Sequence, residues 1–371
     1  MSEHSVLPPS SAARRVACSG SRKLEALYPR EQTEAAQEGE LAHHYAAMHM
    51  KYSEAIKRGI FTLEDPEDIP SYLKYGVNLY IDHVFTVLNN ESIFATNETA
   101  ELHIEERLEM PGIHPECWGT PDAWFVENET LHMFDFKYGF GPVEVYENWQ
   151  MIEYAAGINE RYTKAVFHIV QPRASHPDGP IRTWEVELKD LVEYWDMLMR
   201  TEWEAMQSNP VTKPSPQCVN CQARHACPAL QKTVLSNINT MDISIPHDMN
   251  AAELGNELRI LHNAAKLLDA RITGLEQEAL SLLKSGKRIP HYELGEVQSL
   301  EKWAKDEKEI TALGELFDIE LRKPAEVKFI TPKQAIQAGI PAKVVRQYSE
   351  TPKGAKKLQP IDERKIRKMF S

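Results

Sequence analysis

Residues 117–127, CWGTPDAWFVE, and residues 131–139, LHMFDFKYG, are two strand-like runs separated by the short polar segment 128–130. Together they predict a β-hairpin, because turn residues between two such runs join antiparallel strands. A helix is expected at about 145–158, and the almost continuous apolar run 164–172 is typical of a strand buried on both faces. Strand, helix and buried strand in this order imply a parallel crossover. We therefore expect an α/β fold in which an antiparallel meander leads into a βαβ unit.

Asp135 and Lys137 lie two residues apart on the second run, so their side chains share one face of the strand. Phe134 and Phe136 alternate with them and are expected in the core. Hairpin pairing would bring Asp122, from the first run, to the same place. Two carboxylates and one ammonium on neighbouring strands predict a site for a hard cation, with a charged partner for a phosphate or a nucleophilic water. A surface hairpin with a cross-strand ion pair is the alternative.

The rest of the N-terminal region alternates between helical and strand-like segments. Helices are predicted at 10–17, 31–57, 71–90 and 189–207, and strands at 101–110 and about 182–188. Two pairs of residues have the four-residue spacing of one helix face, Gly39 with His43 and Gln150 with Tyr154. Either pair alone is weak evidence for a site.

Five cysteines are an odd number in a chain expected to be cytosolic, where disulfides rarely persist. Three of them lie in the Pro-flanked run PQCVNCQARHACP, and these are Cys218, Cys221 and Cys227. Converging thiolates suit a soft metal or an iron–sulfur cluster, and Cys18 or Cys117 could supply a fourth ligand. His225 could instead complete a Cys3His zinc site, and reduced surface thiols are the remaining alternative. The spacing alone does not separate zinc from iron–sulfur.

In chain order the sequence contains G-x-x-x-H from Gly39, G-x-x-D from Gly119, D-x-K from Asp135 and Q-x-x-x-Y from Gln150. This series resembles the PD-(D/E)XK nuclease superfamily in its RecB-like branch. One N-terminal cysteine with three distal ones resembles the iron–sulfur members of that branch, among them the cluster-bearing subunit of the AddAB helicase–nuclease and the RecB-like nucleases of CRISPR adaptation. The resemblance covers residues 10 to about 232 and looks most like a phage- or prophage-encoded member.

The resemblance implies a mixed sheet flanked by helices that binds Mg2+ or Mn2+ and hydrolyses DNA. The implied metal ligands are His43, Asp122, Asp135 and a backbone carbonyl, that of Phe136. Lys137 would orient or activate the attacking water, and Gln150 and Tyr154 would position this lysine and the DNA strand. The implied ligands of a [4Fe–4S] cluster are Cys18, Cys218, Cys221 and Cys227. Asp135 departs from the many relatives that have Glu there, Cys117 becomes a packed thiol and His225 a surface residue.

Charge alone would disfavour nucleic acid, since 42 Lys and Arg stand against 55 Asp and Glu, a formal charge of −13 over 371 residues. Residues 321–371, however, contain 13 Lys and Arg against 4 Asp and Glu, a net of +9 that leaves −22 for the rest. This basic tail is a candidate contact for the DNA backbone, or a solvated end. No run is apolar enough for a membrane span or a secretion signal. We therefore expect a cytoplasmic protein, in a bacterial host if it is phage-encoded.

Two parts are expected, a nuclease-like domain over 1–235 and a mainly helical region over 236–371. From about 250 to 285, apolar or Ala residues recur with 4-3-4-3 spacing over four heptads, which predicts a long helix with a coiled-coil-like seam. The seam residues are Leu254, Leu258, Leu261, Ala265, Leu268, Ile272, Leu275, Ala279 and Leu282. This helix could pack on its own domain or self-associate, and both interpretations stay open. The stretch 291–300, HYELGEVQSL, is β-like.

These expectations converge on a metal-dependent DNA exonuclease with a structural cluster, acting in phage recombination or replication. Its partners would be DNA ends, single-stranded ends among them, and by analogy a strand-annealing recombination protein, and an oligomer is compatible with the long helix. One alternative is a non-catalytic DNA-binding or assembly protein on a nuclease scaffold, against which the intact set of Asp122, Asp135 and Lys137 counts. Another is a zinc-bound regulatory protein.

Overall fold

The computed structural model describes residues 5–28, 34–60, 64–93, 100–240, 250–298, 302–317, 319, 321, 331–337, 340–350 and 353–360. Contacts within the chain divide it into two compact units, Met1–Ile272 and Thr273–Ser371. The predicted division into a nuclease-like domain over 1–235 and a mainly helical region over 236–371 stays a prediction. No helix in the described part of the chain combines the length and apolar character that crossing a membrane requires.

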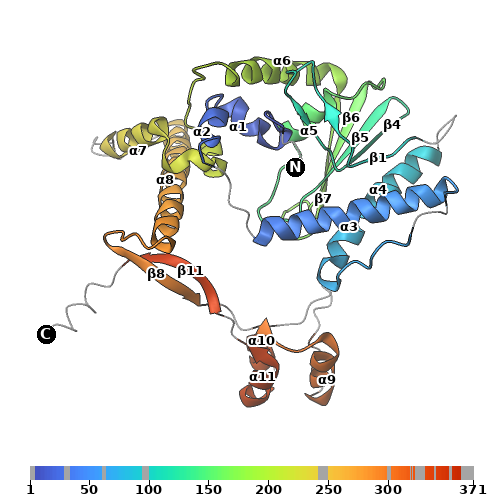
Figure 1. The fold of residues 1–371 in the computed structure, drawn as a ribbon, viewed down its shortest axis with the longest axis vertical. Coiled ribbons are helices and arrows are strands. Elements are labelled where there is room, and N and C mark those ends of the chain that lie inside the picture. Colours follow the sequence, from blue (N-terminus) through green and yellow to red (C-terminus); the bar gives the residue numbers. More distant parts are fainter. Residues whose placement is uncertain are drawn as a thin grey trace. The chain divides into compact units, whose positions relative to one another are not determined.

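The first unit is built on one five-stranded mixed sheet, which makes the chain an α/β protein as expected. The strands lie in the order β1 (His103–Ile104), β4 (Ala123–Glu127), β5 (Thr130–Phe136), β6 (Lys164–Val170) and β7 (Ile181–Glu187). β5 and β6 are parallel and every other pair is antiparallel. The predicted crossover is therefore confirmed, and β5 and β6 occupy the buried middle of the sheet (Figure 1).

The hairpin between β4 and β5 is also confirmed, with a turn one residue shorter than predicted. Glu127 pairs with Thr130, so only Asn128 and Glu129 make the turn. Both have positive φ, 48° and 56°, the left-handed backbone that suits the right-handed twist of the two strands. The register pairs Ala123 with Phe134 and thereby places Asp122 next to the end of β5.

Helices cover both faces of the sheet (Figure 1). α3 (Glu34–Lys57) and α4 (Ser71–Ile93) pack on one face, and α1 (Ala12–Ala17), α5 (Trp149–Ala155) and α6 (Leu188–Ala205) pack on the other. The side chains of β5 alternate between the two layers. Phe134 and Phe136 enter the core under α3 and α4, as predicted, whereas Leu131 and Met133 enter the core under α5 and α6.

The prediction of one strand over 101–110 is wrong. β1 ends at Ile104, and β2 (Leu108–Glu109) belongs to a separate two-stranded sheet with β3 (Trp118–Gly119). Glu105 causes the break, because its φ of 48° is incompatible with an extended strand. Alternating apolar residues thus continue across a point where the backbone changes direction.

α5 is shorter than the predicted helix 145–158. It begins after Asn148, whose side-chain oxygen accepts a hydrogen bond from the backbone N–H of Met151. Such an N-cap satisfies an N–H group that the helix itself leaves without a partner. The segment before it contains Glu147, which has a φ of 52°, so the helix starts only after this left-handed residue.

The remaining elements of the first unit are short, apart from two helices near its end. They are η1 (Pro9–Ser11), α2 (Ser21–Glu25), η2 (Pro216–Asn220), η3 (Gln222–His225), α7 (Pro228–Thr240) and α8 (Ala251–Lys284). α8 confirms the long helix predicted at about 250–285, and its last residues belong to the second unit.

The second unit is small and mixed. Its elements are β8 (Tyr292–Gln298), β9 (Lys302–Trp303), α9 (Glu307–Phe317), α10 (Pro332–Gln337), α11 (Ala342–Tyr348), β10 (Ser349–Glu350) and β11 (Lys353–Pro360). β8 confirms the β-like stretch, and it pairs with β11, which carries part of the predicted basic tail. The most basic run of that tail, 364–368, lies outside the described residues.

A buried ion-pair network of Arg15, Glu153 and Glu202 connects α1 to α5 and α6. Arg15 of α1 donates from Nε to Glu202 of α6 at 2.6 Å and from Nη2 to Glu153 of α5 at 3.3 Å, and all three side chains are at most 2 % exposed. The Cys117 thiol donates to Glu153 at 2.8 Å. Two carboxylates share one guanidinium here, and burial raises the pKa of Glu153 to about 7. Without the Arg15 guanidinium, the two buried carboxyl groups would have no cation beside them in this network.

Replacing Arg15 by Met should lower the free energy of unfolding by about 3–5 kcal/mol, because two buried carboxylates lose their cation. Chemical denaturation followed by circular dichroism measures the effect. Arg200→Met, at an exposed position of α6, is the matched control and should change stability by less than about 0.5 kcal/mol. Equal stability of the two variants would contradict the structural role given to Arg15.

Three histidines form a hydrogen-bonded chain in the core under α4. His83 Nε2 lies 3.1 Å from His168 Nδ1, and His168 Nε2 lies 3.2 Å from His132 Nδ1. Burial lowers the pKa of each imidazole, and the Lys164 ammonium helps to lower that of His132 to about 4. All three rings are therefore neutral in the folded protein at pH 7.

Acidification should consequently destabilise the fold. An imidazole whose pKa is lower in the folded state binds its proton more weakly there, so stability is complete above about pH 6.5 and falls as the pH drops toward 4. For His132 alone the loss between pH 6.5 and 5 is about 1.5 kcal/mol. Denaturant unfolding at both pH values should show a smaller loss for His132→Gln than for the parent, with His44→Gln on the exposed side of α3 as control. A loss in His132→Gln as large as in the parent would contradict this role.

Candidate metal centre and cysteine pocket

Asp122 links three elements at the end of β5. Its Oδ2 accepts a hydrogen bond from the backbone N–H of Phe136 at 2.6 Å, and its Oδ1 lies 3.2 Å from His43 Nδ1. The His43 ring, from α3, also contacts the Phe136 ring at 5.3 Å between centroids. Residues predicted from two separate motifs, His43 and Asp122, thus meet over the strand that carries Asp135.

Glu105 is the member of this group that sequence reasoning missed. Its Oε1 lies 3.7 Å from His43 Nδ1, and its backbone N–H donates to the Asp122 carbonyl at 3.1 Å. Ligand atoms of His43, Glu105 and Asp122 all lie within 4.8 Å of one another, and no other such group of three occurs among the described residues. The left-handed backbone that ends β1 at Glu105 turns its carboxylate to this place, and an alternating apolar pattern does not reveal such a break.

The Asp122 and Glu105 carboxylates keep the His43 imidazole protonated. Burial alone would lower the pKa of this imidazole, but Asp122 and Glu105 outweigh it and raise the pKa to about 10. Burial likewise acts to raise the pKa of Asp122, yet the charges of His43 and Lys137 keep it below its ordinary value. Asp122 is therefore an anion and His43 its counter-cation in the metal-free site.

Asp135, Lys137 and Gln150 form the second half of the site. The Lys137 ammonium donates to Asp135 Oδ1 at 2.9 Å and to Gln150 Oε1 at 3.1 Å, while Gln150 Nε2 donates to Asp135 Oδ1 at 3.1 Å. The shared face predicted for Asp135 and Lys137 is thus confirmed, and Gln150 of α5 closes a three-membered ring of hydrogen bonds. Asp135 Oδ2 is buried and has no hydrogen-bond partner among the described residues.

The pKa shifts in this half follow from burial and charge together. Burial and the nearby Asp122 carboxylate raise the pKa of Asp135, against the opposing effect of Lys137. Burial would lower the pKa of Lys137, but the Asp135 and Asp122 carboxylates more than compensate and raise it. Lys137 is accordingly a fixed ammonium at neutral pH.

Tyr154 packs against the Gly119 segment. Its hydroxyl donates to the Thr120 carbonyl at 3.2 Å, and a Cβ on Gly119 would lie 2.9 Å from its ring. Glycine is needed at 119 for this close approach. A second tyrosine, Tyr80 of α4, was not predicted. Its ring stacks on Phe136 at 4.7 Å, and its buried hydroxyl has no hydrogen-bond partner among the described residues.

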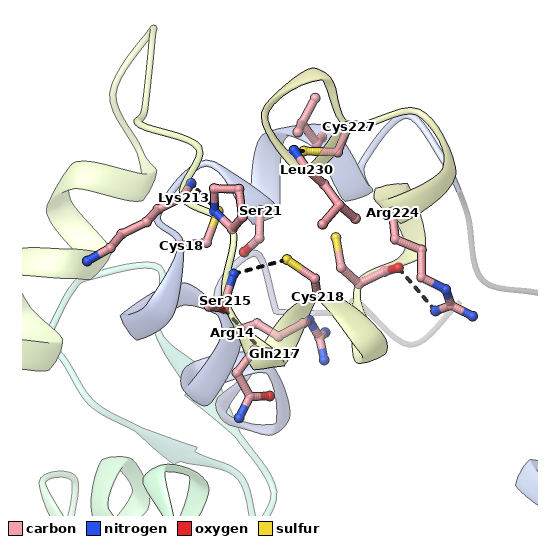
Figure 2. A pocket seen from close by; sticks show the side chains of 13 residues that line it. Arg14, Cys18, Ser21, Lys213, Ser215, Gln217, Cys218, Arg224, Cys227 and Leu230 are labelled. Carbon is pink, nitrogen blue, oxygen red and sulfur yellow. Dashed lines mark hydrogen bonds between the residues drawn. The ribbon is translucent and has the colours of Figure 1, made fainter. Parts of the chain in front are cut away.

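The cysteine pocket lies at the other end of the first unit, where the chain after α1 meets η2, η3 and the start of α7. Four of the five cysteines line this one pocket: Cys18, Cys218, Cys221 and Cys227. Figure 2 shows Cys18, Cys218 and Cys227 on different sides of it. Three sulfurs accept backbone N–H groups, Cys18 from Lys213 at 3.2 Å, Cys218 from Ser215 at 3.3 Å and Cys227 from Leu230 at 3.5 Å.

Three thiols of the pocket, those of Cys18, Cys218 and Cys221, are protonated at neutral pH in the metal-free protein. Burial raises the pKa of Cys18 and Cys218, and that of Cys221 to about 12. Cys117 lies outside the pocket, buried between Glu153 and the Leu7 carbonyl, as predicted for a packed thiol. His225 is half-buried against the Tyr28 ring at 4.5 Å, so the prediction of a surface residue holds only in part.

Residues 4–365 match the family described as "Protein of unknown function (DUF2800)". The chain belongs to this family. The match spans both compact units, so the sheet, the cysteine pocket and the C-terminal unit are parts of one family architecture.

Among solved structures, the chain is similar to an alkaline exonuclease from Laribacter hongkongensis, with 12 % identity, a TM-score of 0.24, and coverage of 54 % of this chain and 89 % of the other. The same enzyme in complex with dAMP matches with 13 % identity, a TM-score of 0.22, and coverage of 52 % and 90 %. A protein described as SSO0001 matches with 13 % identity, a TM-score of 0.27, and coverage of 59 % and 94 %.

Proposed function

We propose that the chain is a metal-dependent deoxyribonuclease of the PD-(D/E)XK type, RecB-like branch, that removes nucleotides from DNA ends. One observation supports this most directly. The hairpin places Asp122 beside the end of β5, and the ammonium of Lys137, the residue after β5, lies 2.9 Å from Asp135 of that strand. Carboxylates that bind a cation and an ammonium that faces the same point are the groups that phosphodiester hydrolysis requires.

The residues present fit a divalent metal ion. Asp135 Oδ2 is a buried carboxylate oxygen without a hydrogen-bond partner among the described residues, and a cation would satisfy it. His43, Glu105 and Asp122 already have their ligand atoms within 4.8 Å of one another. Oxygen ligands suit Mg2+ and Mn2+, and the nitrogen of His43 favours Mn2+. Asp135 is not part of that group of three in the metal-free structure. We propose that its Oδ2 completes the ligand set, together with these three side chains and the backbone carbonyl of Phe136, when a metal ion binds.

A bound metal ion would act as a Lewis acid that lowers the pKa of a coordinated water and neutralises charge on the phosphate. The side chains of the protein would orient the reacting groups. Lys137 is held from two sides by Asp135 and Gln150, so its ammonium can direct a water or a phosphate oxygen without first losing side-chain freedom. Tyr154, anchored on the Thr120 carbonyl, fixes α5 and hence Gln150 against the hairpin.

End-labelled single- and double-stranded DNA provides the test. We expect release of nucleotides with Mn2+, less with Mg2+ and none with EDTA. Asp135→Asn and Lys137→Ala should each lower the rate by roughly 100-fold or more, because they remove a metal ligand and the charge that faces the phosphate. Circular dichroism should show both variants folded.

Lys164→Ala is the matched control, since this lysine lies at the start of β6 and pairs with Glu185 on the sheet surface. Its rate should stay within a factor of about two of the parent, an estimate typical of a surface substitution. An undiminished rate in Lys137→Ala would overturn the assignment. Covalently closed circular DNA should resist the enzyme, whereas its cleavage would indicate an endonuclease. DNA binding without any hydrolysis would indicate the non-catalytic alternative.

We further propose that the cysteine pocket holds a structural [4Fe–4S] cluster. Four thiols line one pocket, and the three N–H···S hydrogen bonds found there stabilise thiolate ligands.

Metal analysis of protein purified without oxygen tests this proposal. We expect iron and acid-labile sulfide, about four of each per chain, and a brown colour that Cys221→Ser abolishes. Cys117→Ser, which alters the buried thiol outside the pocket, should keep its iron. Stoichiometric zinc without iron would assign the pocket to zinc and favour a zinc-bound protein instead.

The biological setting stays a prediction. We propose DNA ends as the partner, with single-stranded ends among them, and a phage- or prophage-encoded role in recombination or replication. A strand-annealing protein as a further partner and a location in the bacterial cytoplasm follow from the same resemblance. The basic tail, residues 321–371, is proposed as a contact for the DNA backbone.

A further inference from the structure

Tyr80 of α4 differs from the other buried tyrosines of the described residues. The hydroxyl groups of the others donate to backbone carbonyls: Tyr138 to Tyr72 at 3.2 Å, Tyr154 to Thr120 at 3.2 Å, and Tyr162 to Ala155 at 2.8 Å. Tyr80 is only 1 % exposed, yet its hydroxyl has no hydrogen-bond partner among the described residues. A buried hydroxyl without a partner lowers the stability of a fold, so this group calls for a partner that the described residues do not supply.

The Tyr80 hydroxyl lies close to the candidate metal centre. Its ring stacks on the Phe136 ring, with 4.7 Å between centroids and an angle of 8° between the planes. Burial raises the pKa of Tyr80 well above its ordinary value, and the negative charges of Asp122, Glu105 and Asp135 raise it further. The hydroxyl therefore stays a neutral hydrogen-bond donor at neutral pH, beside the carboxylates that are proposed to bind the metal ion.

The candidate metal centre is more accessible at its ligands than at Tyr80. The side chains of His43 and Glu105 are 29 % and 30 % exposed and that of Asp122 is 14 % exposed, so an ion can reach them from solvent. Tyr80 is buried, and a nucleotide cannot reach its hydroxyl without opening the core. A water molecule is small enough to do so. Mg2+ and Mn2+ usually keep several coordinated waters when they bind to a protein, so the ion brings an acceptor of the right size.

We propose that Tyr80 is a positioning residue of the metal centre, whose hydroxyl donates a hydrogen bond to a water that accompanies the divalent cation. This inference rests on the proposed function, because it requires a metal ion at that site. A phenol suits the role because it donates a hydrogen bond without a positive charge that would repel the cation. Groups that hydrogen-bond to the ligands of a metal ion fix their orientation and contribute to the affinity for the ion.

Tyr80→Phe tests the proposal, because it removes the hydroxyl and keeps the ring that stacks on Phe136. Isothermal titration of the full-length protein with Mn2+, without DNA, measures the affinity. We expect the dissociation constant to rise roughly 10-fold, as for other groups that orient metal ligands. Asp122→Asn, which removes a proposed ligand, identifies the heat that belongs to this site.

Stability measured with and without metal separates this role from a purely structural one. In EDTA, the denaturation midpoint of Tyr80→Phe should equal or exceed that of the parent, because the variant no longer buries a hydroxyl without a partner. The rise in midpoint on adding Mn2+ should be smaller in Tyr80→Phe than in the parent, because a ligand stabilises in proportion to the logarithm of its affinity.

Tyr162→Phe is the matched control, since this buried hydroxyl donates to the Ala155 carbonyl at 2.8 Å. It should lower the midpoint in EDTA and leave the affinity for Mn2+ unchanged. A Tyr80→Phe protein that binds Mn2+ as tightly as the parent would overturn this inference. So would a loss of stability in EDTA as large as that of Tyr162→Phe, because the Tyr80 hydroxyl would then have a partner without metal.

The same measurements distinguish a failure of this inference from a failure of the proposed function. A parent that degrades DNA with Mn2+, together with unchanged Mn2+ affinity in Tyr80→Phe, would reject this inference alone. A parent that binds Mn2+ more tightly than Tyr80→Phe but does not degrade DNA would reject the nuclease and leave the role of Tyr80 standing. A parent that binds no Mn2+ at this site would overturn both.

Discussion

The buried ion-pair network around Arg15 is the constraint on which both proposed sites depend. Arg15 lies three residues before Cys18, and Glu153 lies between Gln150 and Tyr154 on α5. Glu202 belongs to the helix that leads into the cysteine segment. The Arg15 guanidinium therefore holds α1 against α5 and α6. α5 carries Gln150 of the candidate metal centre, and α6 leads into the segment of the cysteine pocket. All three side chains are buried, so separating them would leave a charged group in the core without a partner. The free energy that this would cost keeps the three helices in place.

The alternation of β5 is the second constraint, and it explains why the candidate metal centre lies between two helical layers. Phe134 and Phe136 fill the core under α3 and α4, which brings α3 with His43 close to the end of the strand. Asp135, between them in sequence, points to the other layer and meets Gln150 of α5. Helices from opposite sides of the sheet thus contribute to one site because neighbouring residues on a strand face opposite ways.

The sequence predicted those features that depend on local periodicity. The hairpin, the parallel crossover, the shared face of Asp135 and Lys137 and the long α8 all follow from spacing along one element. What it missed depends on backbone geometry or distant contacts. Glu105 was hidden because its left-handed φ interrupts an apparently regular strand. The pairing of Arg15 with Glu202 joins residues 187 positions apart, and no pattern of residue types signals it.

The candidate metal centre contains more acidic than basic side chains, as does the chain as a whole. Three carboxylates, on Glu105, Asp122 and Asp135, stand against two cations, on His43 and Lys137, so the metal-free site is net negative and repels a phosphate. On the proposed function, a divalent cation would reverse that balance. The affinities of the site for the cation and for DNA would then raise each other by the same factor, because coupling between two ligands is reciprocal. The net charge of the whole chain would in that case say little about nucleic acid, because the bound metal ion would set the charge that a phosphate meets.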